Sequence, residues 1–373
     1  MSVAPESWPI ALRVLSGCLD TDLTDATRRL AQTMTDADWH SLVHLACTRH
    51  RVAPVIALHL DDLGAPPGTI EEVRQETRAC ALETLRQGAA LKELLSQLSD
   101  AAVDAVILKG LPLGERLYGA AGNRHARDID ILIPPAQIQP AAAILDRLGY
   151  TPAPVYRLRG KLVGSNALAQ ECYDLEYVGG RGHLSVELHW RTSHYAGWPD
   201  FTEEADMTRA QDTSFGPVRV PSDPANLIYL AGHGSMHAWA RLKWLADIGR
   251  LARIRGAEAL AEDMALAGRL GGQVPLALAL RLAHRVMGSP LPKGLERPTP
   301  QIAKLEKQML RVVAAPEIAP GTWRYRWSAN VVSLQLAEGP AQVVGVLRYA
   351  IWRRLRLGAA GLVHALGGRP AVS

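Results

Sequence analysis

The chain has 373 residues, of which 48% are hydrophobic and 21% charged, so it is neither disordered nor restricted to one small core. Its formal net charge of +4 is unevenly placed: residues 341–373 hold five arginines and no acid, which leaves about −1 on the other 340 residues. An enzyme that acts on nucleic acid usually carries a basic surface on its catalytic body. The charge distribution therefore favours a small-molecule or peptide substrate over nucleic acid.

The sequence lacks the marks of a zinc motif, a signal peptide or a membrane span. The four cysteines, at positions 18, 47, 80 and 172, form no CxxC pair and give no argument for a structural zinc site. The first 17 residues have neither a charged start nor a long apolar stretch, and no run of 18 apolar residues occurs. We therefore expect a cytoplasmic protein without a membrane span.

Residues 1–100 predict a helical N-terminal region. Leu91, Leu94 and Leu98 fall at helical spacing near its end. Asp36 is the expected N-cap of an earlier helix, because its carboxylate can accept hydrogen bonds from the first free backbone N–H groups.

From residue 101 the pattern changes to that of a small catalytic core, which we expect to extend to residue 220. Short β-branched runs now alternate with helical stretches, and glycines at residues 179–182 suit a hairpin turn. The whole chain is therefore expected to have an α+β fold, with a mixed β-sheet between helical N- and C-terminal regions. The expected order is strand, short helix, strand, helix and β-hairpin, over residues 102–108, 112–118, 127–133, 138–148 and 173–190.

After residue 220 the chain is again expected to be helical. Asp223 followed by proline predicts the start of a helix that continues to about Ile254. This helix belongs to a helical region, residues 221–290, that packs on the core. Residues 291–373 are expected to form a C-terminal helical region with a basic amphipathic segment. That segment suits either a solvated basic face or an anionic partner surface.

The strongest functional signal is the sequence Asp128-Ile129-Asp130 on a predicted strand. Side chains alternate between the two faces of a strand, so the two aspartates share one face. Glu187, on a later alternating strand, is placed to add a third carboxylate. Magnesium prefers such oxygen ligands together with substrate phosphates, as in displacement at a nucleotide phosphate. The alternative is an exposed strand face with solvated acids.

Basic residues near these acids favour the functional interpretation. Lys109 and Gly110 follow a predicted strand, where a tight turn and a cation suit the binding of a triphosphate. Arg124 and Arg127 flank the aspartates and are candidates for the same role.

A second set of candidate residues falls on one face of the predicted long helix. At the helical repeat, His233, His237, Trp244 and Asp247 form one stripe, with Lys243 at its edge. In one interpretation the stripe is a wall of the active site, where Trp244 stacks on a base and His237 or Lys243 meets phosphate. In the other it is a buried polar network that joins the helix to the sheet.

The motifs LKG, RDIDILI and VELHW together resemble the nucleotidyltransferase superfamily related to DNA polymerase beta. More narrowly, residues 35–255 resemble the bacterial "uncharacterised nucleotidyltransferase" family, which has LKG in place of the usual glycine-serine. The resemblance implies that Asp128 and Asp130 bind catalytic Mg²⁺ or Mn²⁺ and that Glu187 is the third acid, as the last metal ligand or as the base. It also implies that an NTP such as ATP donates its NMP to a small-molecule or peptide acceptor, including in peptide natural-product tailoring.

One departure from the superfamily pattern leaves other function classes open. Gly110-Leu111 stands where the superfamily has glycine-serine, and a leucine cannot contact phosphate. Lys109 is then the expected substitute. A catalytically inactive protein that binds a nucleotide or a partner is the alternative function. A toxin-type nucleotidyltransferase that acts on tRNA is a third, which the charge distribution disfavours.

Overall fold

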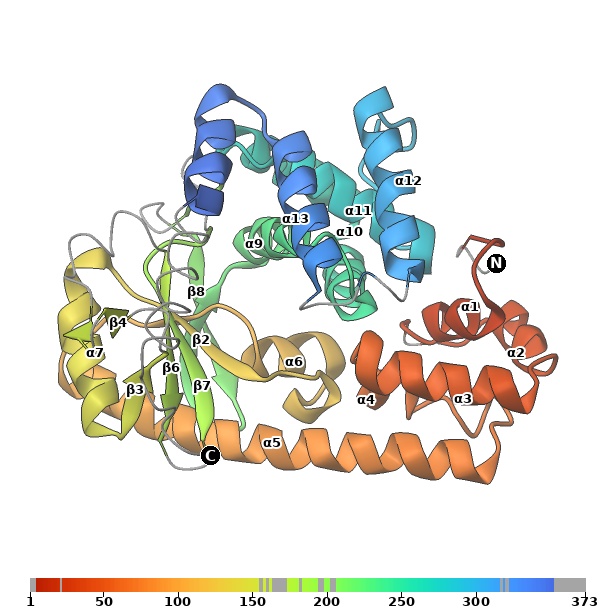
Figure 1. Ribbon diagram of the computed structural model, residues 1–373, viewed down its shortest axis with the longest axis horizontal. Coiled ribbons are helices and arrows are strands. Elements are labelled where there is room, and N and C mark those ends of the chain that lie inside the picture. The colour runs from red at the N-terminus through yellow and green to blue at the C-terminus, as the bar shows by residue number, and fades with distance from the viewer. Residues whose placement is uncertain are drawn as a thin grey trace.

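The computed structural model has the α+β fold that the sequence predicts, with helices around one mixed β-sheet (Figure 1). The arginines of the basic segment beyond residue 351 lie outside the described part of the chain, and the division into four regions stays a prediction. The structure describes residues 5–351 apart from residues 21, 154–156, 159–160, 163–172, 181–182, 194–197, 202–205, 316–317 and 319–321.

Short helices at the N-terminus lead into the very long helix α5 (Pro67–Asp100), which runs along the molecule to the sheet (Figure 1). The prediction of Asp36 as N-cap is wrong by one residue. Thr35 is the cap, because its hydroxyl accepts a hydrogen bond from the backbone of Asp38 while the Asp38 carboxylate accepts one from Thr35. The shorter elements are α1 (Ile10–Gly17), α2 (Asp25–Ala31), α3 (Asp36–His44), the π-helical turn η1 (Leu45–Arg49) and α4 (Ala53–Ile56).

Five strands form the mixed sheet in the order β1-β2-β7-β6-β3. At its centre β2 (Asp128–Leu132) and β7 (Leu184–His189) are parallel, and their register sets Asp130 directly beside Glu187. The predicted hairpin is confirmed, because β7 pairs antiparallel with β6 (Asp174–Gly179). The outer strands are β1 (Val106–Ile107), antiparallel to β2, and β3 (Tyr150–Pro152), antiparallel to β6.

The alternation of β2 and β7 divides their side chains between a core and a cavity. Ile129 and Val186 are buried in one apolar cluster with Leu94 of α5 and Leu145 of α7 (Ile138–Arg147). Each such side chain contributes about 1.5–3 kcal/mol by leaving water. The aspartates of β2 and the glutamate of β7 consequently point away from this core.

A second hairpin beside the sheet was not predicted. Its strand β8 (Thr208–Thr213) reads TRAQDT, which lacks the apolar alternation of a half-buried strand. Its partner β9 (Gly216–Pro221) buries Val218 and Val220 in the apolar cluster of the sheet. The remaining short elements of this part are α6 (Leu111–Tyr118), the 3₁₀ turns η2 (Ala121–Asn123) and η3 (Pro135–Gln137), and the strand pair β4 (Arg157–Leu158) and β5 (Lys161–Leu162).

The predicted single helix from Asp223 to Ile254 is wrong, because two helices occupy this stretch. α9 (Asp223–Met236) ends before a turn, and α10 (Leu242–Arg269) begins after it. Above them in Figure 1 lie α11 (Gln273–Met287), α12 (Pro300–Ala314) and α13 (Trp323–Leu336).

The break between α9 and α10 has a local cause. Ala238 and Trp239 have φ angles of 47° and 51°, in the left-handed region that a right-handed helix cannot contain. The Trp239 ring folds back onto Gly234, where a Cβ atom would lie only 2.4 Å from the indole. This fold-back directs the chain out of α9 and into α10.

Candidate active site

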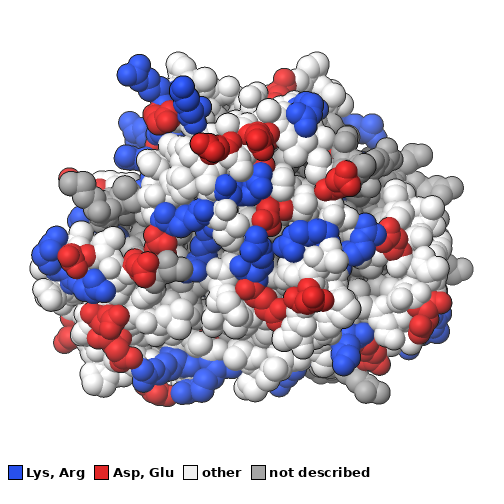
Figure 2. Space-filling view, turned by 180° about the vertical axis from the view of Figure 1, so that it is seen from behind, with Lys and Arg blue, Asp and Glu red and all other residues white. Residues whose placement is uncertain are grey.

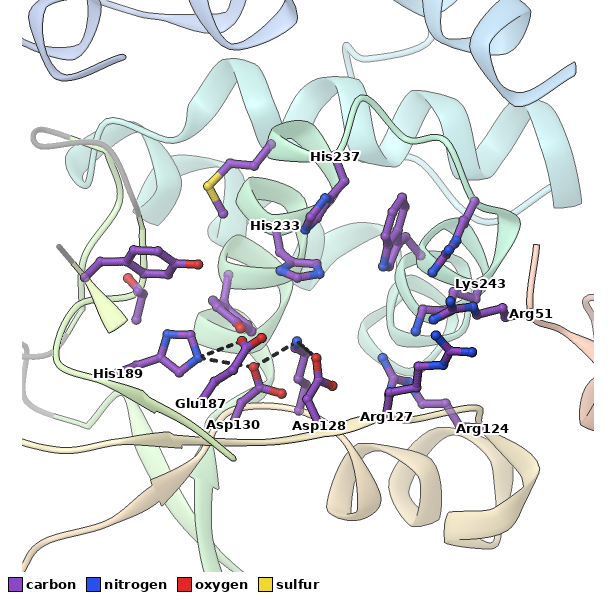
Figure 3. Close-up of a pocket in the computed structure, with 17 residues that line it drawn as sticks. Arg51, Arg124, Arg127, Asp128, Asp130, Glu187, His189, His233, His237 and Lys243 are labelled. Atoms are coloured by element: carbon purple, nitrogen blue, oxygen red, sulfur yellow. Dashed lines mark hydrogen bonds and ion pairs between the residues drawn. The ribbon is translucent and has the colours of Figure 1, made fainter. Parts of the chain in front are cut away.

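A cavity of about 240 Å³ lies between one face of the central strands β2 and β7 and the facing sides of α9 and α10 (Figure 3). Of the predicted site residues, all but Gly110 and Asp247 line it. The residues that line the cavity are Arg51, Lys109, Arg124, Arg127, Asp128, Asp130, Tyr173, Glu187, His189, Thr192, Tyr229, His233, Met236, His237, Arg241, Lys243 and Trp244.

Three carboxylates, those of Asp128, Asp130 and Glu187, form an acidic cluster on the cavity face of β2 and β7 (Figure 3). The Asp130 side chain is fully buried, whereas those of Asp128 and Glu187 are 31% and 26% exposed. His189 lies between two of them, with Nε2 at 3.1 Å from Asp130 Oδ1 and 3.4 Å from Glu187 Oε2. Ligand atoms of Asp130, Glu187 and His189 all lie within 4.8 Å of one another.

Lys109 is buried at the acidic cluster and not at the opposite wall. Its Nζ lies 2.8 Å from Asp130 Oδ1 and 3.7 Å from Asp128 Oδ2. Gly110 makes this placement possible, because its φ of 82° with ψ of −128° is open only to glycine. Leu111, at the position of the superfamily's serine, is buried as the first residue of α6.

Four cations, Arg51, Arg127, Arg241 and Lys243, form a basic cluster at the other side of the cavity. None of them has an ion-pair partner within the described part of the chain. Burial, and then the neighbouring Arg241, lower the pKa of Arg51 to about 10. Burial, and then Arg124, lower the pKa of Lys243 to about 7. The cavity thus has an acidic and a basic side.

Arg124 lines the cavity but is held by a buried ion pair. Its Nε and Nη2 lie 2.9 Å and 2.8 Å from the two carboxylate oxygens of Asp247. The hydroxyl of Tyr118 donates to the same carboxylate at 2.8 Å. Because both carboxylate oxygens are taken, this bidentate pair ties the loop before β2 to α10.

The predicted stripe of His233, His237 and Trp244 comes together, although the three residues do not share one helix. The His237 ring is stacked on Trp244 with centroids 4.9 Å apart, and His233 meets His237 edge-on at 4.6 Å. Tyr325 of α13 bonds to His237 Nδ1 through its hydroxyl. Asp247 is directed instead to Arg124. The rings therefore both line the cavity and belong to a polar network, so the two predicted interpretations overlap.

Residues 35–288 match the sequence family described as uncharacterised nucleotidyltransferase. The chain belongs to this family. The match confirms the resemblance carried by the LKG, RDIDILI and VELHW motifs. Among curated proteins the chain has no match. Part of the chain is similar to the solution structure of the antibiotic-resistance factor ANT(2'')-Ia, with 17% identity and a TM-score of 0.36, over 50% of this chain and 93% of that one. In the described part of the chain, no helix combines the length and apolarity needed to cross a membrane.

Sequence reasoning missed two members of the basic cluster, Arg51 and Arg241. Arg51 follows the π-helical turn η1 and has a positive φ of 55°, an uncommon conformation for a residue with a side chain. Arg241 precedes α10 in the turn that the sequence did not predict. Arg51 lies within residues 35–255, the range of the family resemblance, and this position was the available signal for it.

The acidic cluster makes the stability of the folded protein depend on pH. Burial, and then the charge of Asp130, raise the pKa of Glu187 from 4.5 to about 8. Burial opposes charge on His189, but hydrogen bonds to Asp130 and Glu187 outweigh it and raise the pKa from 6.5 to about 10. In both groups the folded protein holds a proton that the unfolded chain releases. Stability is therefore lost as pH rises, between about 4.5 and 8 for Glu187 and between about 6.5 and 10 for His189.

We expect the free energy of unfolding in the presence of a chelator to fall from pH 6.5 to pH 8, because Glu187 and His189 act in the same direction and together outweigh the opposite effect of Lys243 above pH 7. Urea titrations at half-unit pH steps would measure this slope. His189→Gln should make stability rise with pH just above pH 8, where Glu187 has finished titrating and Lys243, with its pKa lowered from 10.5 to about 7, acts in the opposite direction. A wild-type stability that rises over this range would contradict the assigned protonation.

Proposed function

We propose that the cavity binds a divalent metal ion together with an NTP and transfers the NMP to a small-molecule or peptide acceptor. The observation that supports this most is the division of the cavity into an acidic and a basic side. A metal–triphosphate complex needs both, because its cation takes carboxylate oxygens and its phosphates take arginine and lysine donors.

The acidic cluster has the donor set for a hard cation. Asp130 Oδ2 is buried and has no hydrogen-bond partner among the described residues, which leaves it as a vacant ligand. Carboxylate oxygens of Asp128, Asp130 and Glu187 would therefore hold Mg²⁺ or Mn²⁺. When bound, such an ion neutralises phosphate charge that develops during transfer.

The chain's own residues suit displacement at the α-phosphorus. An acceptor oxygen or nitrogen forms a bond to this phosphorus as the bond to the β-phosphate breaks and pyrophosphate leaves. A bound cation would keep Glu187 ionised, the form in which its carboxylate holds the ion and takes the acceptor proton. Arg51 and Arg127 would bind the leaving pyrophosphate.

The α9–α10 wall would receive the base of the nucleotide. The stacked rings of His237 and Trp244 offer an aromatic surface in the cavity, on which a base can stack. Lys243, whose Nζ donates to the backbone oxygen of His125 at 3.4 Å, belongs to the basic cluster that would bind the phosphates. A nearby phosphate would favour its charged form.

The distribution of surface charge supports a small or peptide acceptor. On the face shown in Figure 2, basic and acidic side chains are intermixed instead of forming one broad basic patch. Tight binding of tRNA draws on many lysine and arginine contacts to phosphates. A toxin-type activity on tRNA therefore has little support from this face.

Incubation of the protein with Mg²⁺, each of four α-labelled NTPs and a panel of hydroxyl, phosphate, amine and peptide acceptors would test the proposal. The expected result is metal-dependent release of pyrophosphate and transfer of label to one acceptor class. Absence of metal-dependent NTP binding in calorimetry would overturn it.

The second candidate is a nucleotide-binding protein without turnover. Two observations favour it: Leu111 replaces the superfamily's serine, and Lys109 already occupies the space between Asp128 and Asp130. NTP binding with no pyrophosphate release across the whole acceptor panel would decide for this candidate.

Replacement of the basic cluster is expected to weaken nucleotide binding selectively. Arg127→Met or Arg51→Met removes a hydrogen bond to a charged group, which is worth about 1.5–3 kcal/mol, or roughly 10- to 100-fold in Kd. Calorimetry with a non-hydrolysable NTP and Mg²⁺ would measure the loss. Arg86→Met is the matched control, because Arg86 on α5 is exposed and lies outside the cavity. If Arg127→Met and Arg51→Met bound the NTP with the same Kd as the Arg86→Met control, the two arginines would not bind phosphate.

A further inference from the structure

A second group of metal-ligating side chains lies on α5, away from the acidic cluster. Glu76 and Cys80 are one helical turn apart on this helix, and His125 belongs to the loop before β2. One ligand atom from each of the three residues lies within 4.8 Å of the other two. The Cys80 Sγ is 3.8 Å from Glu76 Oε1.

The imidazole of His125 is available as a ligand. Its Nδ1 is buried and has no hydrogen-bond partner in the described part of the chain. Burial and the nearby cations, Lys243 first, lower the pKa of His125 to about 3 and so keep the ring neutral, which is the form that binds metals. A buried imidazole nitrogen without a partner is costly unless something occupies it.

The donor set is that of a borderline or soft cation. One nitrogen, one thiolate sulfur and one carboxylate oxygen are the ligands zinc takes, whereas magnesium takes oxygens alone. Burial, and then Glu76, raise the pKa of Cys80 to about 12, so the free site holds a thiol. Metal binding would replace the thiol proton, which leaves to solvent, with the metal–sulfur bond.

The site can be reached from solvent. Glu76 lines an open groove of about 490 Å³ between α5 and the α3–η1 segment, and Cys47 and Glu72 line it as well. An ion can therefore reach Glu76 from solvent, and water or a groove residue can complete its coordination.

We propose that Glu76, Cys80 and His125 bind one divalent transition-metal ion such as zinc. This ion would hold the loop before β2 against α5. The loop already rests on this helix, because Gln87 Nε2 donates to the backbone oxygen of Ala126 at 3.4 Å. The same loop carries Arg127 into the cavity, so the bound ion would hold Arg127 in position there. This inference does not depend on the proposed transfer reaction.

Cobalt is the probe for this site. After removal of bound metals, titration of the full-length protein with Co²⁺ is expected to give the near-ultraviolet absorption of a cobalt–thiolate bond at one equivalent. Cys80→Ser should abolish the band, and His125→Gln or Glu76→Gln should weaken Co²⁺ binding at least about tenfold. Zn²⁺ should displace the cobalt and remove the band.

Two controls separate this site from other thiols and from the acidic cluster. Cys18→Ser changes a thiol buried in the separate helical core and should leave the band unchanged. Asp128→Asn changes the acidic cluster at a side chain that is 31% exposed and should also leave the band unchanged. No band in the wild-type protein, a band that survives in Cys80→Ser, or one lost in either control would overturn the proposal. His125→Gln removes a ligand from a loop, so its result stands even where Cys80→Ser fails to fold.

Discussion

Asp128→Asn and Asp130→Asn are each expected to lower the rate of NMP transfer by about 10³-fold or more. Each change replaces a carboxylate of the acidic cluster with a neutral amide that binds a divalent cation weakly. Loss of several kcal/mol of charge stabilisation at the phosphates corresponds to this factor. Initial rates of pyrophosphate release, with Mg²⁺ and NTP held constant, would measure it.

The two variants separate an effect on catalysis from an effect on folding. Asp130 is fully buried against Lys109 and His189, so Asp130→Asn should also destabilise the metal-free protein. Asp128 is 31% exposed, and its contact with Lys109 is longer than that of Asp130, at 3.7 Å compared with 2.8 Å. The Asp128→Asn variant should therefore remain as stable as the wild type. Asp212→Asn, on the exposed part of β8, is the control that should keep full activity. Activity that survives in both cluster variants would remove the cluster from the mechanism.

Asp247→Asn is expected to lower the free energy of unfolding by about 3–5 kcal/mol, because it leaves the buried Arg124 guanidinium without its counter-charge. The pair is 5% and 1% exposed and bidentate, so solvent cannot compensate for the loss. The Tyr118 hydroxyl, which donates to Asp247, would lose part of its bond as well. Urea unfolding monitored by tryptophan fluorescence would measure the change.

An exposed ion pair provides the contrast for this prediction. Glu83→Gln breaks the contact with Arg86 on α5, where both side chains are at least 36% exposed, and should cost no more than about 1 kcal/mol. The double variant Arg124→Met/Asp247→Leu should recover much of the loss, since it leaves no unpaired buried charge. A cost below 1 kcal/mol for Asp247→Asn would show that the pair does not hold the loop to α10.

Lys109 shows where a motif predicts the residue but not its partners. The sequence indicates a cation beside a glycine turn, and phosphate was the expected ligand. The structure turns the side chain onto Asp128 and Asp130, because Gly110 reverses the chain beside β2. Whether Lys109 reaches phosphate on nucleotide binding stays a prediction, while its neutralisation of the acidic cluster follows from the distances.

The local sequence pattern was enough by itself to predict that the two aspartates of the acidic cluster lie side by side. The two-residue period of a strand puts Asp128 and Asp130 on one face whatever the rest of the chain does. The motifs around them were enough to place the chain in its family, and the alternation of apolar runs was enough for the α+β class. Each of these three predictions rests on residues that are close together in the sequence.

The tertiary structure alone decided which distant residues complete the cavity. The parallel register of β2 and β7 sets Glu187 beside Asp130, and packing of α10 on the loop before β2 commits Arg124 to Asp247. The break after α9, which local helical periodicity does not reveal, turns Arg241 toward the cavity. Such placements depend on packing between segments far apart in the chain, and no local repeat in the sequence specifies that packing.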